Sequence, residues 1–141
     1  YGESYAVASV YALPLATASM EVISRIYAPS ETAELKRVLL PGGRVIVVTP
    51  ADEHLIGLRQ RIYQVVRPHP EPGPLEGFVA LEQQRVSFAL NVPAGELTAS
   101  LLKMTPFAWK MDEQLQQQLI AAGIQDTADF YLTVYVAESD V

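Results

Sequence analysis

The most constraining feature of this sequence is a helical pattern that breaks off in a turn and leads directly into an apolar run. The spacing of Leu35, Val38 and Leu39 predicts one buried face of a helix. Pro41-Gly42-Gly43 ends this pattern, and residues 44–49 follow at once as a nearly continuous apolar run. Such a run is typical of a central strand covered on both faces. The helix-to-strand order therefore predicts a parallel crossover in an α/β domain.

Strand and helix patterns alternate along the rest of the chain around one long interruption. Four prolines between residues 68 and 74 predict an extended loop, since proline neither continues a helix nor pairs in a central strand. Strands are predicted over residues 5–10, 20–24, 44–49, 82–92 and 128–136, and helices from Ser30 to Pro41 and over 52–66, 95–103 and 112–122. These elements predict an α/β fold whose mixed sheet combines parallel strands with an antiparallel C-terminal edge.

Composition limits the class of protein and the partners that we expect. The chain has 141 residues, of which 50% are hydrophobic and 18% are charged, enough for one domain with a core. It has no cysteine, no apolar run long enough for a membrane span and no secretory pattern at its start. We therefore expect a soluble, cytoplasmic protein with no membrane partner. The net charge of −6 counts against a nucleic-acid partner.

The motifs resemble those of one enzyme family. The stretch from Leu35 to Val45, LKRVLLPGGRV, is similar to a signature of class I methyltransferases, in which Pro-Gly-Gly leads into strand five. The segments RIYAP at 25–29, TP at 49–50 with HL at 54–55, LEGF at 75–78 and MTPFAW at 104–109 together resemble the 23S rRNA guanine-N1 methyltransferases. This resemblance extends from about Ser4 to Tyr135.

The resemblance implies that residues 1–141 are the C-terminal part of a class I, Rossmann-like methyltransferase domain. The family's N-terminal zinc finger, its Gly-rich loop for S-adenosylmethionine and its ribose-binding acid do not occur in this sequence. We therefore expect zinc only in an absent N-terminal part, and little methyl transfer by this chain alone. Residues 5–9 would occupy strand three and lack their usual neighbours, so we expect them to be disordered, to pair with a second copy in a homodimer, or to belong to a larger chain.

Site residues follow from the same resemblance. Ala8, Ser9, Arg25, Ile26 and His54 are expected to contact S-adenosylmethionine. Tyr27, Thr105, Phe107 and Trp109 are expected to bind the substrate, with the aromatic rings stacking on RNA bases. Tyr27 and His54 are the candidate catalytic residues, because methylation of guanine N1 requires loss of a proton. His69, in the proline-rich loop, is expected to be solvated.

Three functions remain open at this point. The resemblance implies S-adenosylmethionine-dependent methylation of guanine N1 in 23S rRNA. A class I methyltransferase acting on a small molecule is the alternative, since fold does not determine substrate and the net charge favours this interpretation. A non-catalytic fragment that serves as an interaction module is the third.

Overall fold

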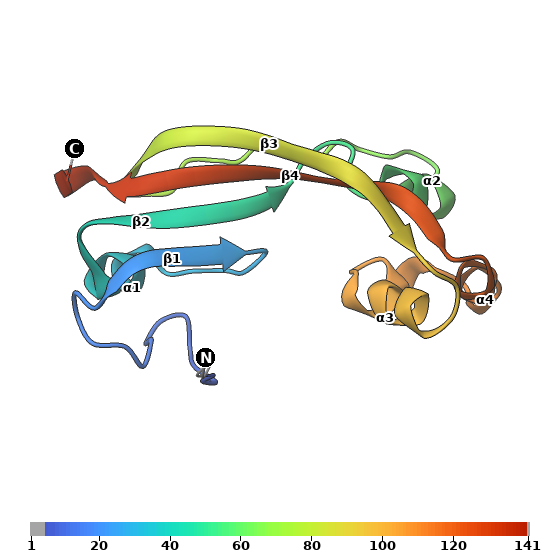
Figure 1. Cartoon of the computed structure of the whole chain (residues 1–141), viewed down its shortest axis with the longest axis horizontal. Coiled ribbons are helices and arrows are strands. Elements are labelled where there is room, and N and C mark those ends of the chain that lie inside the picture. Colours follow the sequence, from blue (N-terminus) through green and yellow to red (C-terminus); the bar gives the residue numbers. More distant parts are fainter. Residues whose placement is uncertain (1–4, 141) are drawn as a thin grey trace. The chain divides into compact units, whose positions relative to one another are not determined.

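The computed structural model describes residues 5–140, which contain four strands and four α-helices (Figure 1). The strands are β1 (Met20–Ile26), β2 (Leu39–Pro50), β3 (Phe78–Val92) and β4 (Ile124–Ala137). The helices are α1 (Thr32–Val38), α2 (Ile56–Ile62), α3 (Glu96–Met104) and α4 (Glu113–Ala122), with 3₁₀ turns η1 (Ala108–Lys110) and η2 (Glu138–Asp140).

The strands form one mixed sheet in the order β1-β2-β4-β3. β1 and β2 are parallel and are joined through α1, as the sequence predicts. The arrows in Figure 1 show β4 running opposite to β2 and to β3. The mixed α/β class is therefore confirmed, including antiparallel pairing of the late strands. The last strand itself lies inside the sheet, and β3 forms the edge.

The chain divides into two compact units, each built from segments that are distant in sequence. Unit 1 comprises residues 1–49, 71–85 and 131–141, and unit 2 comprises residues 50–70 and 86–130. The core of unit 1 contains Leu35, Leu39, Val45, Val47, Leu75, Phe78, Tyr135 and Ala137. The core of unit 2 contains Leu55, Leu58, Leu102, Met111, Leu119 and Ile124.

The Pro-Gly-Gly segment is an irregularity inside β2, whereas the sequence pattern places it at the end of the helix. α1 already ends at Val38, and β2 begins at Leu39. The register with β1 shifts between Met20↔Leu39 and Val22↔Arg44. Gly42 has φ +74°, which side chains other than hydrogen strongly disfavour. Gly42 and Gly43 therefore allow the backbone to form a bulge in β2.

Within the described structure β2 is fully buried on one face and partly buried on the other, whereas the sequence pattern predicts full burial on both. Val45 and Val47 are buried in the core of unit 1. Their neighbours Ile46 and Val48 point to the opposite face, where they are only partly buried. The sequence of β2 is apolar on both faces, but only the face that carries Val45 and Val47 is fully buried.

Residues 5–10 do not form the predicted strand. Residues 5–8 have no regular structure, and Ser9 makes only an isolated antiparallel bridge with Ala12. A strand needs a neighbour for its backbone N–H and C=O groups. β1 pairs with β2 instead, and the segment 5–9 does not lie in the sheet.

The helix ends can be compared with the predicted ranges. Asp112 caps α4, since its side chain accepts a hydrogen bond from the Leu115 N–H at 2.7 Å, and the helix ends before Gly123, as predicted. α1 is preceded by Glu31 rather than Ser30, whose hydroxyl instead accepts from Arg25. No helix within residues 5–140 is both long and apolar enough to span a bilayer.

Candidate functional site

The predicted residues Arg25, Ile26 and Tyr27 lie where β1 ends, in unit 1. Tyr27 leaves the strand with a left-handed φ of 52°, while its N–H still donates to the Val48 carbonyl at 3.4 Å. Ile26 and Tyr27 are 60% and 54% exposed. The Arg25 Nη1 donates to the Ser30 hydroxyl at 2.5 Å. This strand end therefore presents an apolar, an aromatic and a cationic side chain.

The Tyr27 phenol is neutral at physiological pH. Desolvation raises its pKa from 10.0 to about 12. A group that holds its proton this firmly cannot act as a base near neutral pH. It can donate a hydrogen bond or stack on a planar ligand.

Ala8 and Ser9 lie in an exposed turn of unit 1. The Ser9 hydroxyl accepts from the Tyr11 N–H at 3.2 Å, and its carbonyl accepts from the Ala12 N–H at 3.1 Å. The hydroxyl hydrogen can still donate, so Ser9 fits an acceptor nitrogen of adenine. Arg25 fits the carboxylate of S-adenosylmethionine. Contact of Ala8, Ser9, Arg25, Ile26 or His54 with this cofactor stays a prediction.

His54 lies in a turn of unit 2 that precedes α2. The helix begins at Ile56 and not near residue 52, because Leu55 adopts a left-handed φ of 51°. The turn is tied to β4 by two backbone hydrogen bonds. The Ala51 N–H donates to the Asp129 carbonyl at 2.9 Å, and the Leu55 N–H donates to the Thr127 carbonyl at 2.8 Å. His54 is therefore held on a fixed backbone.

The His54 imidazole is held as a neutral ring. The Asp129 N–H donates to its Nδ1 at 3.3 Å, and the Phe130 ring centroid lies 4.7 Å away. Desolvation, followed by the charge on His69, lowers the His54 pKa from 6.5. Because Nδ1 accepts a hydrogen bond, the neutral ring carries its hydrogen on Nε2. In this tautomer His54 is a hydrogen-bond donor and not a base.

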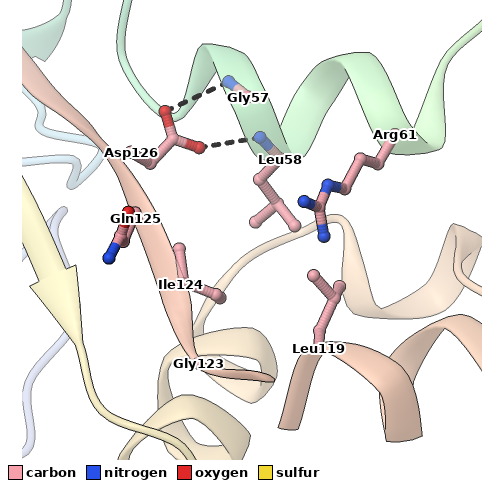
Figure 2. Close-up of a pocket in the computed structure, with 8 residues that line it drawn as sticks. All are labelled: Gly57, Leu58, Arg61, Leu119, Gly123, Ile124, Gln125 and Asp126. Atoms are coloured by element: carbon pink, nitrogen blue, oxygen red, sulfur yellow. Dashed lines mark hydrogen bonds between the residues drawn. The ribbon is translucent and has the colours of Figure 1, made fainter. Parts of the chain in front are cut away.

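Asp126 anchors the start of α2 from the neighbouring strand β4. Its carboxylate accepts from the Gly57 N–H at 3.1 Å and from the Leu58 N–H at 2.7 Å (Figure 2). In this view the Arg61 guanidinium and the Leu119 side chain extend toward the same small cavity. The cavity has a volume of about 60 Å³, so it suits water rather than an organic ligand. Asp126 is thus a positioning residue for α2 and for Tyr63, which follows this helix.

A larger hollow lies beside the C-terminal end of α2. We call it the aromatic hollow; its volume is about 340 Å³ and its lining residues are Arg59, Tyr63, Val65, Val66, Arg67, His69 and Phe107. The Tyr63 and Phe107 rings meet edge to face, with centroids 6.0 Å apart. The Lys110 Nζ lies 5.0 Å from the centroid of the Tyr63 ring. The hollow combines aromatic and aliphatic walls with positive charge.

The predicted substrate-binding residues of unit 2 have different environments. Phe107 lines the aromatic hollow, and Trp109 in η1 is 93% exposed. Thr105 is buried, and its hydroxyl donates to the Leu102 carbonyl at 2.8 Å. That bond completes the end of α3. Substrate contact by these three residues stays a prediction.

Three residues of unit 2 have structural roles or burial that the sequence reading did not predict. Asp129 is buried and accepts from the Glu53 N–H at 3.0 Å, and Asp126 caps α2. Two acids within an apolar strand were a usable signal, because aspartate is depleted in strands. His69 was expected to be solvated, yet its Nε2 is buried without a hydrogen-bond partner among residues 5–140. No local pattern indicated the burial of His69.

Sequence comparison links the chain to a group of named proteins. It is 33% identical over 115 residues to a 23S rRNA (guanine(748)-N(1))-methyltransferase from Streptomyces fradiae, a match that covers 77% of this chain and 41% of that protein. It is 31% identical over 122 residues to YxjB of Bacillus subtilis strain 168, provisionally named a 23S rRNA (guanine-N(1)-)-methyltransferase, with 74% and 39% coverage. The chain thus spans about two fifths of these relatives.

Two further matches are shorter or looser. A provisionally named 23S rRNA (guanine-N(1)-)-methyltransferase from Micromonospora griseorubida is 46% identical over 50 residues, covering 36% of this chain and 17% of that protein. A solved structure from Bacillus halodurans C-125, provisionally titled a methyltransferase, gives a TM-score of 0.45 at 13% identity; the match covers 91% of this chain and 68% of that chain. No family model matches the chain.

Proposed function

We propose, from the premise that this chain is related over most of its length to 23S rRNA guanine-N1 methyltransferases, that it forms part of an enzyme with this activity. The enzyme would transfer a methyl group from S-adenosylmethionine to N1 of a guanine in 23S rRNA in the cytoplasm. The observation that carries the proposal is the 33% identity with the S. fradiae enzyme over 77% of the chain. The substrate-side motifs noted in the sequence point the same way.

Class I transfer is an in-line displacement at a sulfonium methyl group, for which S-adenosylmethionine supplies the reactive carbon. The protein contributes positioning and a matched electrostatic environment. Arg25 would pair with the cofactor carboxylate, and the exposed side chain of Ile26 would pack beside it. Ala8 and Ser9 would border the adenine.

Guanine N1 must lose a proton when it is methylated, and this proton would pass to solvent water, since Tyr27 and His54 are not bases in the described state. In the described tautomer His54 would donate from Nε2, for example to the carbonyl oxygen beside N1, and so stabilise the deprotonated base. Tyr27, as a neutral phenol, would stack on the guanine or hydrogen-bond to it. Thr105, Phe107 and Trp109 would contribute on the substrate side, with Thr105 acting through the end of α3.

One observation favours a second function. The net charge of −6 suits a small-molecule acceptor better than an RNA with its phosphates. A class I methyltransferase for a small substrate is therefore the alternative. An rRNA-directed enzyme would need its basic residues gathered locally, and in unit 2 they include Arg67 and Lys110 beside the aromatic hollow.

The test is methyl transfer by the whole protein that contains this chain. Purified protein is incubated with methyl-labelled S-adenosylmethionine and either 23S rRNA lacking the modification or a small-molecule metabolite extract. The rRNA is then digested to nucleosides and analysed by mass spectrometry. Label in 1-methylguanosine is expected. Label only in small molecules would support the alternative, and no label in either fraction would contradict both.

A further inference from the structure

We propose that the aromatic hollow of unit 2 holds one unpaired base of the RNA substrate, with the adjoining phosphate near Arg67 and Lys110. This inference rests on the proposed function and adds a site to it. The sequence indicated Phe107 as a base-stacking residue and Arg67 and Lys110 as cations able to reach RNA phosphates, but not that they lie around one hollow. Tyr63 has no role in the methyl transfer described above.

The walls of the hollow suit a planar ring. Tyr63 and Phe107 meet edge to face, and the Lys110 ammonium lies over the Tyr63 ring. Val65 and Val66 add aliphatic surface, and Val65 is one of the most exposed large apolar side chains of the chain. Unpaired RNA bases bind to such surfaces by stacking, with little dependence on base identity. An exposed aromatic and aliphatic surface of this kind is also unfavourable in water unless something covers it.

The charge around the hollow selects RNA over the cofactor. Arg59 is fixed by hydrogen bonds from Nη1 to the Asp52 carbonyl at 3.0 Å and from Nη2 to the Arg67 carbonyl. Its charge therefore stays beside the hollow, while the side chain of Arg67 is exposed and that of Lys110 lies over Tyr63. This positive set would attract a phosphate and repel the sulfonium of S-adenosylmethionine.

The size of the hollow agrees with a single base. Its volume of about 340 Å³ lies near the lower end of the roughly 300–1,000 Å³ typical of small-molecule pockets. His69 lines the hollow, and its Nε2 is buried without a hydrogen-bond partner among residues 5–140. Native proteins usually pair such atoms, and a polar edge of a bound base would be one partner.

The experiment measures RNA affinity of the whole protein by fluorescence anisotropy, using a labelled single-stranded RNA oligomer of about ten nucleotides. The key variant is Phe107→Leu, which keeps apolar volume but removes the ring. Its control is Phe88→Leu, an exposed aromatic residue of the same unit outside the hollow. Lys110→Gln is paired with Lys103→Gln, which removes the same charge from the exposed end of α3.

We expect Phe107→Leu to weaken RNA binding by about 5- to 100-fold, the range for one lost base stack. Lys110→Gln should weaken binding and reduce its salt dependence, while Phe88→Leu and Lys103→Gln change little. Replacing single nucleotides of the oligomer by abasic ones should reproduce the Phe107→Leu loss at one position. Circular dichroism of each variant checks folding, and Tyr63→Leu provides a second removal of a ring.

The outcomes separate this inference from the proposed function. Unchanged RNA affinity in the folded Phe107→Leu and Tyr63→Leu variants would overturn the inference, even if 1-methylguanosine forms normally. A loss of S-adenosylmethionine affinity with unchanged RNA affinity would assign the hollow to the adenine and overturn it too. Retained, abasic-sensitive RNA binding without any methyl transfer would support the inference and contradict the proposed function.

Discussion

The main-chain N–H of Asp129 donates a hydrogen bond to the Nδ1 of His54, which fixes the orientation of the imidazole from the neighbouring strand. The carboxylate of Asp129 accepts from the Glu53 N–H in the same turn. The backbone and side chain of one buried aspartate therefore hold two consecutive residues. This arrangement places the ring hydrogen of neutral His54 on Nε2.

Replacing His54 should separate its structural role from its chemical one. His54→Ala removes the acceptor for the Asp129 N–H, and we expect a loss of about 1–3 kcal/mol in the free energy of unfolding. His54→Asn places an acceptor near the position of Nδ1 but has nothing at Nε2, so it should be close to wild type in urea denaturation. In the methyltransferase assay both variants should be impaired. Full activity in His54→Asn would rule out a role for Nε2.

The two histidines of unit 2 make stability depend on pH. Desolvation is the main cause that lowers the pKa of His54 and of His69 from 6.5 in the folded state. The unfolded chain therefore binds protons more readily, and stability must fall as pH drops below about 6.5. Urea midpoints measured between pH 8 and pH 5 should decline in this window.

A double variant, His54→Asn with His69→Asn, serves as the control for this pH dependence. Its urea midpoint should change much less between pH 7 and pH 5. Glu34 acts only at lower pH, because its hydrogen bond from Arg37 lowers its pKa from 4.5 to about 2. A wild-type midpoint that stays constant down to pH 5 would contradict the prediction.

Asp126→Ala tests the anchoring of α2. The carboxylate satisfies the N–H groups of Gly57 and Leu58 at the start of this helix, and we expect the variant to lose about 0.5–2 kcal/mol of unfolding free energy. The exposed neighbour Gln125→Ala is the matched control and should be close to neutral. Equal effects of both substitutions on the denaturation midpoint would show that the cap is not important.

Gly43→Ala tests the bulge in β2. A Cβ at this position would lie 2.9 Å from the Leu40 carbonyl oxygen and 3.1 Å from that of Glu21, too close for either atom to remain in place. We expect a loss of about 1–3 kcal/mol, similar to overpacking elsewhere. Gly73→Ala, where nothing lies within 4 Å of the added carbon, should not destabilise the protein. Thermal unfolding compares the two variants.

Tyr27→Phe distinguishes stacking from proton transfer. Because the pKa of the phenol is raised to about 12, we expect the hydroxyl to stay protonated and the variant to lose far less than the roughly 100-fold or more attributed to a general base. Tyr27→Ala should weaken RNA binding by about 5- to 100-fold, since it removes the ring. Rates and RNA affinities are compared at pH 7.5. A large rate loss in Tyr27→Phe with unchanged affinity would point to the hydroxyl.

The sequence predicted elements well where a local signal determines them. Asp112 and Gly123 delimit α4 because a side-chain cap and a helix-ending glycine act within one turn. The parallel β1–β2 pair follows from alternating strand and helix patterns. The failures arise from tertiary context. Leu97 lies in the predicted helix 95–103 but is 62% exposed, since the burial of one helix face depends on what packs against it.

The candidate site was less predictable because its residues depend on contacts between distant segments. His54 was chosen from its motif, but its tautomer depends on Asp129, which lies 75 positions away. The aromatic hollow joins Tyr63 to Phe107, and neither the spacing nor the proline-rich loop between them indicates that they meet. Residues 5–10 also failed for a tertiary reason. Their sequence is typical of a strand, but they have no neighbouring strand in the sheet and form no strand themselves.

The division of the chain has a consequence for how its parts can be separated. The backbone passes between the two units four times, at 49/50, 70/71, 85/86 and 130/131. β3 and β4 each contribute residues to both units. No single proteolytic cut or truncation point within residues 5–140 can therefore release either unit intact. Exchanging one unit with that of a relative would require recombination at four junctions.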